Sequence, residues 1–138
     1  MILHCNFEEL AALTAAATRV LERSAVAHGV AAPPQLEELE DLLPRLVGDL
    51  SIASLADQVR VRSALGLLTD DLRSRMDVVI LEQHPAAEDA VLAYFDYAHA
   101  LSVLRRADAL GREMELLVEV LTGEPPASER AQRFTFPD

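Results

Sequence analysis

Residues 90–104, with the sequence AVLAYFDYAHALSVL, decide the fold class of this chain. Only Asp96, His99 and Ser102 are clearly polar among these fifteen residues. A helix that is apolar on nearly every side is buried on most of its sides. The stretch therefore predicts either the central helix of a helical bundle or the contact between two chains.

Two long helical patterns make up the second half of the chain, and the second of them contains this stretch. Apolar residues recur at helical spacing over about 51–83, with Ser51 and Ser54 both candidates for the start. A second pattern follows Pro85 and covers about 85–122. Together they predict a long helical hairpin. Because that hairpin is longer than a compact chain of 138 residues requires, we expect a homodimer that completes the core.

Two glycines interrupt the hairpin pattern. Gly66 lies inside the first long segment, and Gly111 follows Leu110 in the second. Glycine weakens a helix by about 1 kcal/mol relative to alanine. We interpret Gly66 as a site of close packing or of a kink, and Leu110-Gly111 as a site for a break.

The rest of the chain adds shorter elements to an all-α bundle. A first helix is predicted over about 7–28, behind a capping box formed by Asn6 and Glu9. A short helix is predicted over about 34–43. Residues 2–5 are a short apolar run that suits a strand, and Phe134 and Phe136 in the tail alternate as in a half-buried strand. We expect one all-α domain over 1–138, with the tail paired to the N-terminal segment or packed on the bundle.

Composition restricts the function classes. All 12 basic residues are Arg, so mechanisms that need a lysine, such as a phosphate-binding P-loop or a Schiff base, are excluded. The net charge of −11 argues against nucleic-acid binding and against an anionic membrane surface. No apolar run reaches membrane-spanning length, and no signal peptide is recognisable. With Cys5 as the only cysteine, we expect a cytoplasmic protein.

Asp96 and His99 are the strongest candidates for chemistry. They lie one helical turn apart, so they share a face, and a carboxylate and an imidazole suit a divalent metal such as iron, manganese or zinc. His84 and Glu88 are candidate additional ligands from the adjoining turn. Di-metal bundles carry two Glu-x-x-His steps and two further Glu, whereas this chain has a single Asp-x-x-His step. The structural alternative is a buried Asp–His hydrogen bond that fixes the core or the dimer.

Catalytic motifs are missing from the sequence. There is no nucleophile elbow, zinc-protease pair, dinucleotide-binding turn or Cys-x-x-Cys pair. His4 and Cys5 are adjacent, so on a strand their side chains point to opposite faces and cannot pair. A lone cysteine near an apolar terminus is typical of a small core residue, and no catalytic residue is predicted.

The sequence therefore favours a non-catalytic helical interaction, assembly or regulatory protein that forms a homodimer. The first alternative is a bundle that binds a metal or small ligand through Asp96 and His99. The second alternative is an acidic inhibitor that covers a basic partner surface. Its candidate acidic faces are Glu37, Glu38, Glu40 and Asp41, or Glu113, Glu115 and Glu119.

Overall fold

A computed structural model describes residues 1–28, 34–82 and 88–123. It confirms the all-α bundle with a long helical hairpin. The helices are α1 (Phe7–His28), α2 (Pro34–Leu42), α3 (Leu55–Glu82) and α4 (Glu88–Thr122), and a 3₁₀ turn at Leu43–Arg45 follows α2. A two-stranded sheet is formed by β1 (Ile2–Leu3) and β2 (Leu50–Ser51).

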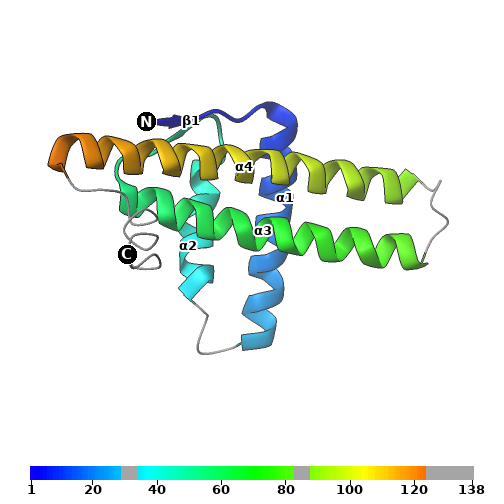
Figure 1. The fold of residues 1–138 in the computed structure, drawn as a ribbon. Helices are drawn as coiled ribbons and strands as arrows, with labels where there is room; N and C mark the ends of the chain where they lie inside the picture. The colour runs from blue at the N-terminus through cyan, green and yellow to red at the C-terminus, as the bar shows by residue number, and fades with distance from the viewer. Residues whose placement is uncertain (29–33, 83–87, 124–138) are drawn as a thin grey trace, which may run out of the picture.

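Helices α3 and α4 form the hairpin and share the largest helix contact of the described chain (Figure 1). The buried face of α4 repeats every seven residues at Ala93, Ala100, Ala107 and Met114. A seven-residue repeat is the pattern of helices that wrap around each other as a coiled coil. The small alanines let the two helices approach closely, so the hairpin is tightly packed.

Neither glycine breaks its helix. Helix α4 runs unbroken through Gly111, so the predicted break there is wrong. Gly111 is instead a point of close packing: a Cβ atom at this position would lie 2.5 Å from Nε2 of Gln58 on α3. Gln58 is buried, and its Nε2 donates a hydrogen bond to the carbonyl oxygen of Ala107 at 2.9 Å. Gly66 meets only the side chain of Arg62, and α3 continues through it.

The core lies where α1 and α2 pack against the hairpin. Figure 1 shows α1 crossing α3 and α4 at a steep angle, with α2 beside it toward the end where α3 begins. The largest fully buried side chains gather there, and they are mostly leucines from α1, α2 and α3. They are Leu13, Leu39, Leu42, Leu50, Ile52, Leu65, Leu68, Leu72 and Val103. The hairpin continues past α1 toward the end of α3 and the start of α4 (Figure 1).

The N-terminal segment pairs with the connection between α2 and α3. Ile2 is opposite Ser51 and Leu3 is opposite Leu50 in an antiparallel register. Ser51 therefore belongs to a strand, and the prediction of a helix from residue 51 is wrong by four residues. Ser54 is the cap, because its Oγ accepts a hydrogen bond from the backbone N–H of Asp57 at 3.0 Å. The C-terminal tail, which was predicted to pair with the N-terminal segment or to pack on the bundle, lies outside the described residues.

Candidate functional site

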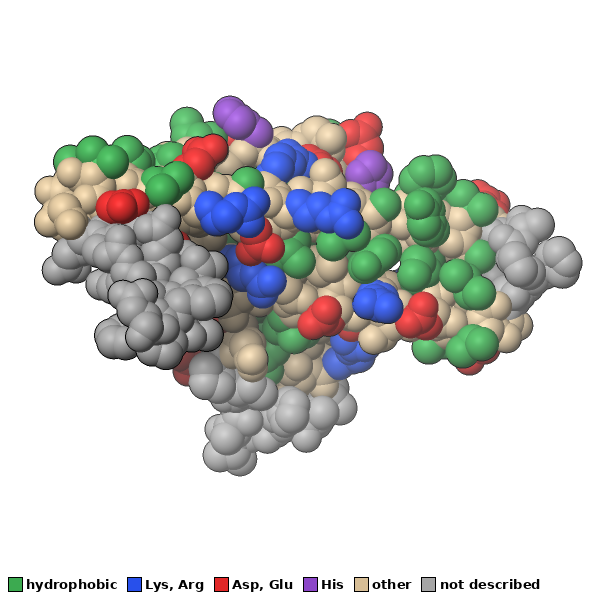
Figure 2. All heavy atoms as spheres, viewed as in Figure 1, with side chains coloured by type: hydrophobic (Ala, Val, Ile, Leu, Met, Phe, Trp, Pro, Cys, Tyr) green, Lys and Arg blue, Asp and Glu red, His purple; other side chains and the backbone are tan. Residues whose placement is uncertain are grey.

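Large apolar side chains are exposed on the part of the hairpin that extends past α1. Leu81 on α3 is 85% exposed, and Phe95 on α4 is 51% exposed. We call this surface the apolar arm and define it by seven residues: Val78, Ile80, Leu81, Val91, Leu92, Tyr94 and Phe95. Figure 2 shows hydrophobic side chains gathered over this end of the hairpin. Such a concentration is typical of a surface that another molecule covers.

The arm is exposed because no third helix of the described chain covers it. Beyond Leu72, no residue of α3 is buried, and before Ala100, the only buried residues of α4 are Ala90 and Ala93. Both alanines lie on the α4 face that packs on α3. In a single chain, the prediction that residues 90–104 are buried on most sides is therefore wrong for the first part of the stretch. Residues 91, 92, 94 and 95 are exposed, whereas residues 96–101 are buried or partly buried.

Asp96 and His99 lie at the base of the arm, each partly buried. Within the described residues, no hydrogen bond or ion pair joins them, so the structural alternative of an Asp–His bond is not formed. Glu88 begins α4 about two turns before Asp96 and is exposed, while His84 lies outside the described residues. No group of three metal-binding side chains occurs in the described ranges. A metal site on Asp96, His99, His84 and Glu88 stays a prediction.

Asp96 instead lies near a charge cluster where α1 crosses the hairpin. The Asp71 carboxylate on α3 pairs with Arg23 on α1, and Arg19 Nη2 lies 3.9 Å from Asp71 Oδ2. Burial lowers the pKa of Arg19, and Arg75 lowers it further, while Asp71 and Asp96 act in the opposite direction. The cluster holds α1 against α3, which is a structural task.

A second polar cluster attaches the N-terminus to α4. The predicted capping box is confirmed: Asn6 N donates to Glu9 Oε1 at 2.9 Å, and Glu9 N donates to Asn6 Oδ1 at 2.8 Å. Arg106 of α4 pairs with the other oxygen of Glu9 and also donates to the carbonyl oxygen of His4, and no local sequence pattern predicts either contact. Glu9 is only 3% exposed, so this ion pair is largely withdrawn from water.

His4 and Cys5 lie just after β1, which ends at Leu3, so the predicted strand over residues 2–5 is shorter than expected. The exposed His4 ring lies 3.0 Å from an Asp49 carboxylate oxygen. The Cys5 thiol turns inward toward the carbonyl oxygen of Leu3. Burial raises the pKa of the Cys5 thiol, Arg106 counteracts that rise, and Asp49 adds to it. A raised pKa lowers the fraction of thiolate, which is the reactive form of a cysteine.

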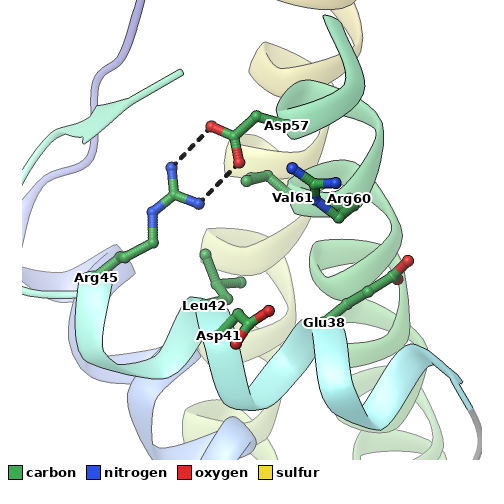
Figure 3. Close-up of a pocket in the computed structure, with 7 residues that line it drawn as sticks. All are labelled: Glu38, Asp41, Leu42, Arg45, Asp57, Arg60 and Val61. Atoms are coloured by element: carbon green, nitrogen blue, oxygen red, sulfur yellow. Dashed lines mark hydrogen bonds and ion pairs between the residues drawn. The ribbon is translucent and has the colours of Figure 1, made fainter. Parts of the chain in front are cut away.

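A pocket of about 230 Å³ lies between α2 and the start of α3 (Figure 3). Arg45 and Asp57 form a two-pronged ion pair at its edge, with nitrogen–oxygen distances of 3.0 and 3.1 Å. Arg45 also donates to the carbonyl oxygen of Ser51, and Asp57 accepts from the N–H of Ala53. These bonds fix the link between β2 and α3. The remaining lining residues are Glu38, Asp41, Leu42, Arg60 and Val61.

A shallow groove of about 590 Å³ follows α4 from the arm toward its middle. Its described lining comes from α4 alone and combines tyrosines, small residues and arginines. These residues are Tyr94, Tyr97, Ala98, Leu101, Ser102, Arg105, Arg106 and Ala109. The groove is continuous with the apolar arm through Tyr94.

Comparison with known proteins adds no relative to this description. No protein-family model, curated protein or solved structure matches the chain. Among the described helices, none combines the length and the apolar character needed to cross a bilayer.

Proposed function

We propose that this is a non-catalytic helical interaction or assembly protein that works through its apolar arm. The observation that carries the proposal is the exposure of the seven arm residues on a helix pair that no other described helix covers at this end. Burying a large apolar side chain stabilises a contact by about 1.5 to 3 kcal/mol. Leaving seven of them half exposed is therefore costly unless another protein surface covers them.

The polar clusters support the same proposal because they link elements of the fold. Glu9 and Arg106 join the first turn of α1 to α4, Arg45 and Asp57 join the 3₁₀ turn to α3, and Asp71 joins α3 to α1. Each pair holds two elements together. Their shared role is structural, which leaves the exposed apolar surface of the described helices, and the arm within it, for function.

The net charge and the cysteine content indicate the kind of partner and the compartment. A net charge of −11 favours a protein partner over nucleic acid or an anionic membrane. A single cysteine supports a reducing compartment such as the cytosol. We expect the protein to act there as a homo-oligomer, most simply a dimer.

Sedimentation velocity tests the proposal. The wild type and a Val91→Glu/Phe95→Glu variant are compared over a range of protein concentrations. Both positions are about half exposed, so we expect the variant to keep its helical circular dichroism and to lose self-association. Val47→Glu is the matched control, because Val47 is 87% exposed and lies outside the arm. A wild type that stays monomeric, or an assembly that the arm variant leaves intact, contradicts the proposal.

A second candidate is a divalent-metal site, favoured by the shared face of Asp96 and His99 and by their lack of a bond to any described residue. Its test is metal retention measured by elemental analysis. Loss of bound metal in His99→Ala, at unchanged helicity, supports the site. A wild type that retains no metal, or a His99→Ala variant that retains as much as the wild type, contradicts it.

A further inference from the structure

The outward face of α4 is open along its length. Val91, Ala98, Arg105 and Arg112 follow each other at a spacing of seven residues, on the side opposite the buried stripe that packs on α3. None of the four is buried. Val91 and Ala98 make the first half of this strip apolar, and apolar residues at this spacing are the pattern of a contact with another helix.

The groove along this face has the shape that a helix contact needs. Its small residues, Ala98, Ser102 and Ala109, alternate with the larger Tyr94 and Leu101. Small residues leave holes between their neighbours, and large residues of a partner helix fill such holes. The face therefore holds both the protruding and the receiving parts of a helix–helix contact, and it can be complementary to itself.

Charge decides the relative direction of two such faces. Glu88 is exposed at the start of α4 and Arg105 is exposed further along, whereas the exposed Glu113 follows Arg112 directly and offsets its charge. In the described part of the chain, Glu88 and Arg105 form no hydrogen bond or ion pair with another residue. Parallel copies would place like charges side by side. Antiparallel copies place Arg105 of one chain near Glu88 of the other, which is favourable.

We propose that two copies of this chain pair through α4 in antiparallel orientation, with Ala98 at the twofold axis. This proposal rests on the proposed function and specifies its partner and register. In this register, Arg105 lies opposite Val91 and the turn that begins at Glu88, and Tyr94 lies opposite Ser102. The smallest side chain of the face is then at the point where the two helices come closest.

The α4 part of the apolar arm supplies the apolar surface of this contact. Its four residues, Val91, Leu92, Tyr94 and Phe95, are each about half exposed and together present roughly 300 Å² of apolar surface. The groove extends this surface along α4 toward Arg105 and Ala109. The rest of a standard interface, which buries about 800 Å² on each partner, comes from the groove and its polar rim.

Disulfide trapping tests the register. Ala98→Cys is made in a Cys5→Ser background, which removes the only native cysteine. Two cysteines at a twofold axis between close helices satisfy the short Cα separation of a disulfide, so mild oxidation is expected to link nearly all chains into covalent dimers. The control is Val120→Cys in the same background. Val120 is also on α4 and is 79% exposed, but it lies about 33 Å along the helix from Ala98.

The outcomes separate this inference from the proposed function. A covalent dimer at position 98 and little at position 120 supports the register. A wild type that dimerises through the arm, with Ala98→Cys left unlinked, overturns the register and leaves the proposed function standing. Equal linking at positions 98 and 120 also overturns the register. A monomeric wild type overturns both proposals.

A charge exchange provides a second, independent readout. We expect Arg105→Glu to weaken the dimer about tenfold, because it removes the attraction to the acidic end of the partner. The double variant Glu88→Arg/Arg105→Glu exchanges the charges at both ends of the contact and is expected to restore most of the loss. A double variant that is weaker than Arg105→Glu alone contradicts the antiparallel orientation.

Discussion

At the scale of single residues, Glu9 best illustrates how local and distant contacts combine. Its bond with Asn6 belongs to a local motif, so it could be predicted from a spacing of three residues. Its pairing with Arg106 joins positions 97 residues apart in the sequence, and no local pattern encodes it. The sequence therefore predicts the cap of α1 and misses the ion pair that attaches this cap to α4.

Glu9→Ala is predicted to lower the free energy of unfolding by about 2 to 3 kcal/mol, because it removes the capping bond and leaves Arg106 without its carboxylate. Urea denaturation followed by circular dichroism measures the change. Glu8→Ala is the control in the same helical turn, since Glu8 is exposed, and it should change stability by less than about 0.5 kcal/mol. Equal effects of the two variants would show that the ion pair contributes nothing.

Asp57 gives a pH-dependent prediction. The hydrogen bond from Arg45 lowers the pKa of Asp57, burial opposes this, and the Ala53 N–H contributes in the same direction as Arg45. The unfolded chain therefore binds a proton more readily than the folded chain. The contribution of Asp57 is fully present above its unfolded pKa and is lost as the pH falls through the lower folded pKa.

Melting temperatures measured between neutral and strongly acidic pH check this prediction. The melting temperature of the wild type should fall at strongly acidic pH. Asp57→Asn should melt at a lower temperature at neutral pH, and its melting temperature should fall less on acidification. Asp41→Asn, at an exposed acid of the same pocket, is the control and should follow the wild type. An Asp57→Asn curve parallel to that of the wild type would contradict the assigned role.

At the scale of elements, the helices with strong apolar periodicity could be predicted from the sequence. Some of their boundaries could not, because they depend on contacts with distant segments. The helix over 7–28 is confirmed residue for residue because its cap and its apolar stripe are both local. Of the two candidate starts of α3, Ser54 is confirmed as the cap, and Ser51 is wrong although serine by itself is compatible with a helix start. Ser51 lies in a strand because Ile2, almost fifty residues away, supplies its partner. Long-range pairing of this kind has no signature in a single short segment.

Packing between elements gives a matched pair of glycine variants. Gly111→Ala places a Cβ atom 2.5 Å from the buried Gln58 amide, so Gln58 must move and lose its bond to Ala107. We expect a net loss of about 1 to 2 kcal/mol, since overpacking outweighs the gain in helix propensity. Gly66→Ala meets only the Arg62 guanidinium at 3.1 Å, so it should be neutral or stabilising by up to about 1 kcal/mol. Thermal denaturation of both variants decides, and a stabilised Gly111→Ala would contradict the close packing.

At the scale of the whole molecule, the exposed arm is the property that the sequence only partly predicted. The apolar composition of residues 90–104 indicated a contact on several sides, and the length of the hairpin favoured a second chain. Which sides are open depends on where α1 crosses the hairpin, and that crossing is fixed by side-chain packing between distant segments (Figure 1). The position of the exposed surface could therefore be known only from the structure, whereas the expectation of a partner followed from the sequence.

Native mass spectrometry of the untagged protein, purified without chelator, measures self-association through the apolar arm. We expect a dimer of about 30 kDa, twice the 15.1 kDa chain, and its dissociation to monomer in Val91→Glu/Phe95→Glu. The same spectrum reports any retained metal, and an added metal mass that disappears in His99→Ala would favour the second candidate function. A wild type that appears only at 15.1 kDa across the accessible concentrations would contradict the claim that the apolar arm is a self-association surface.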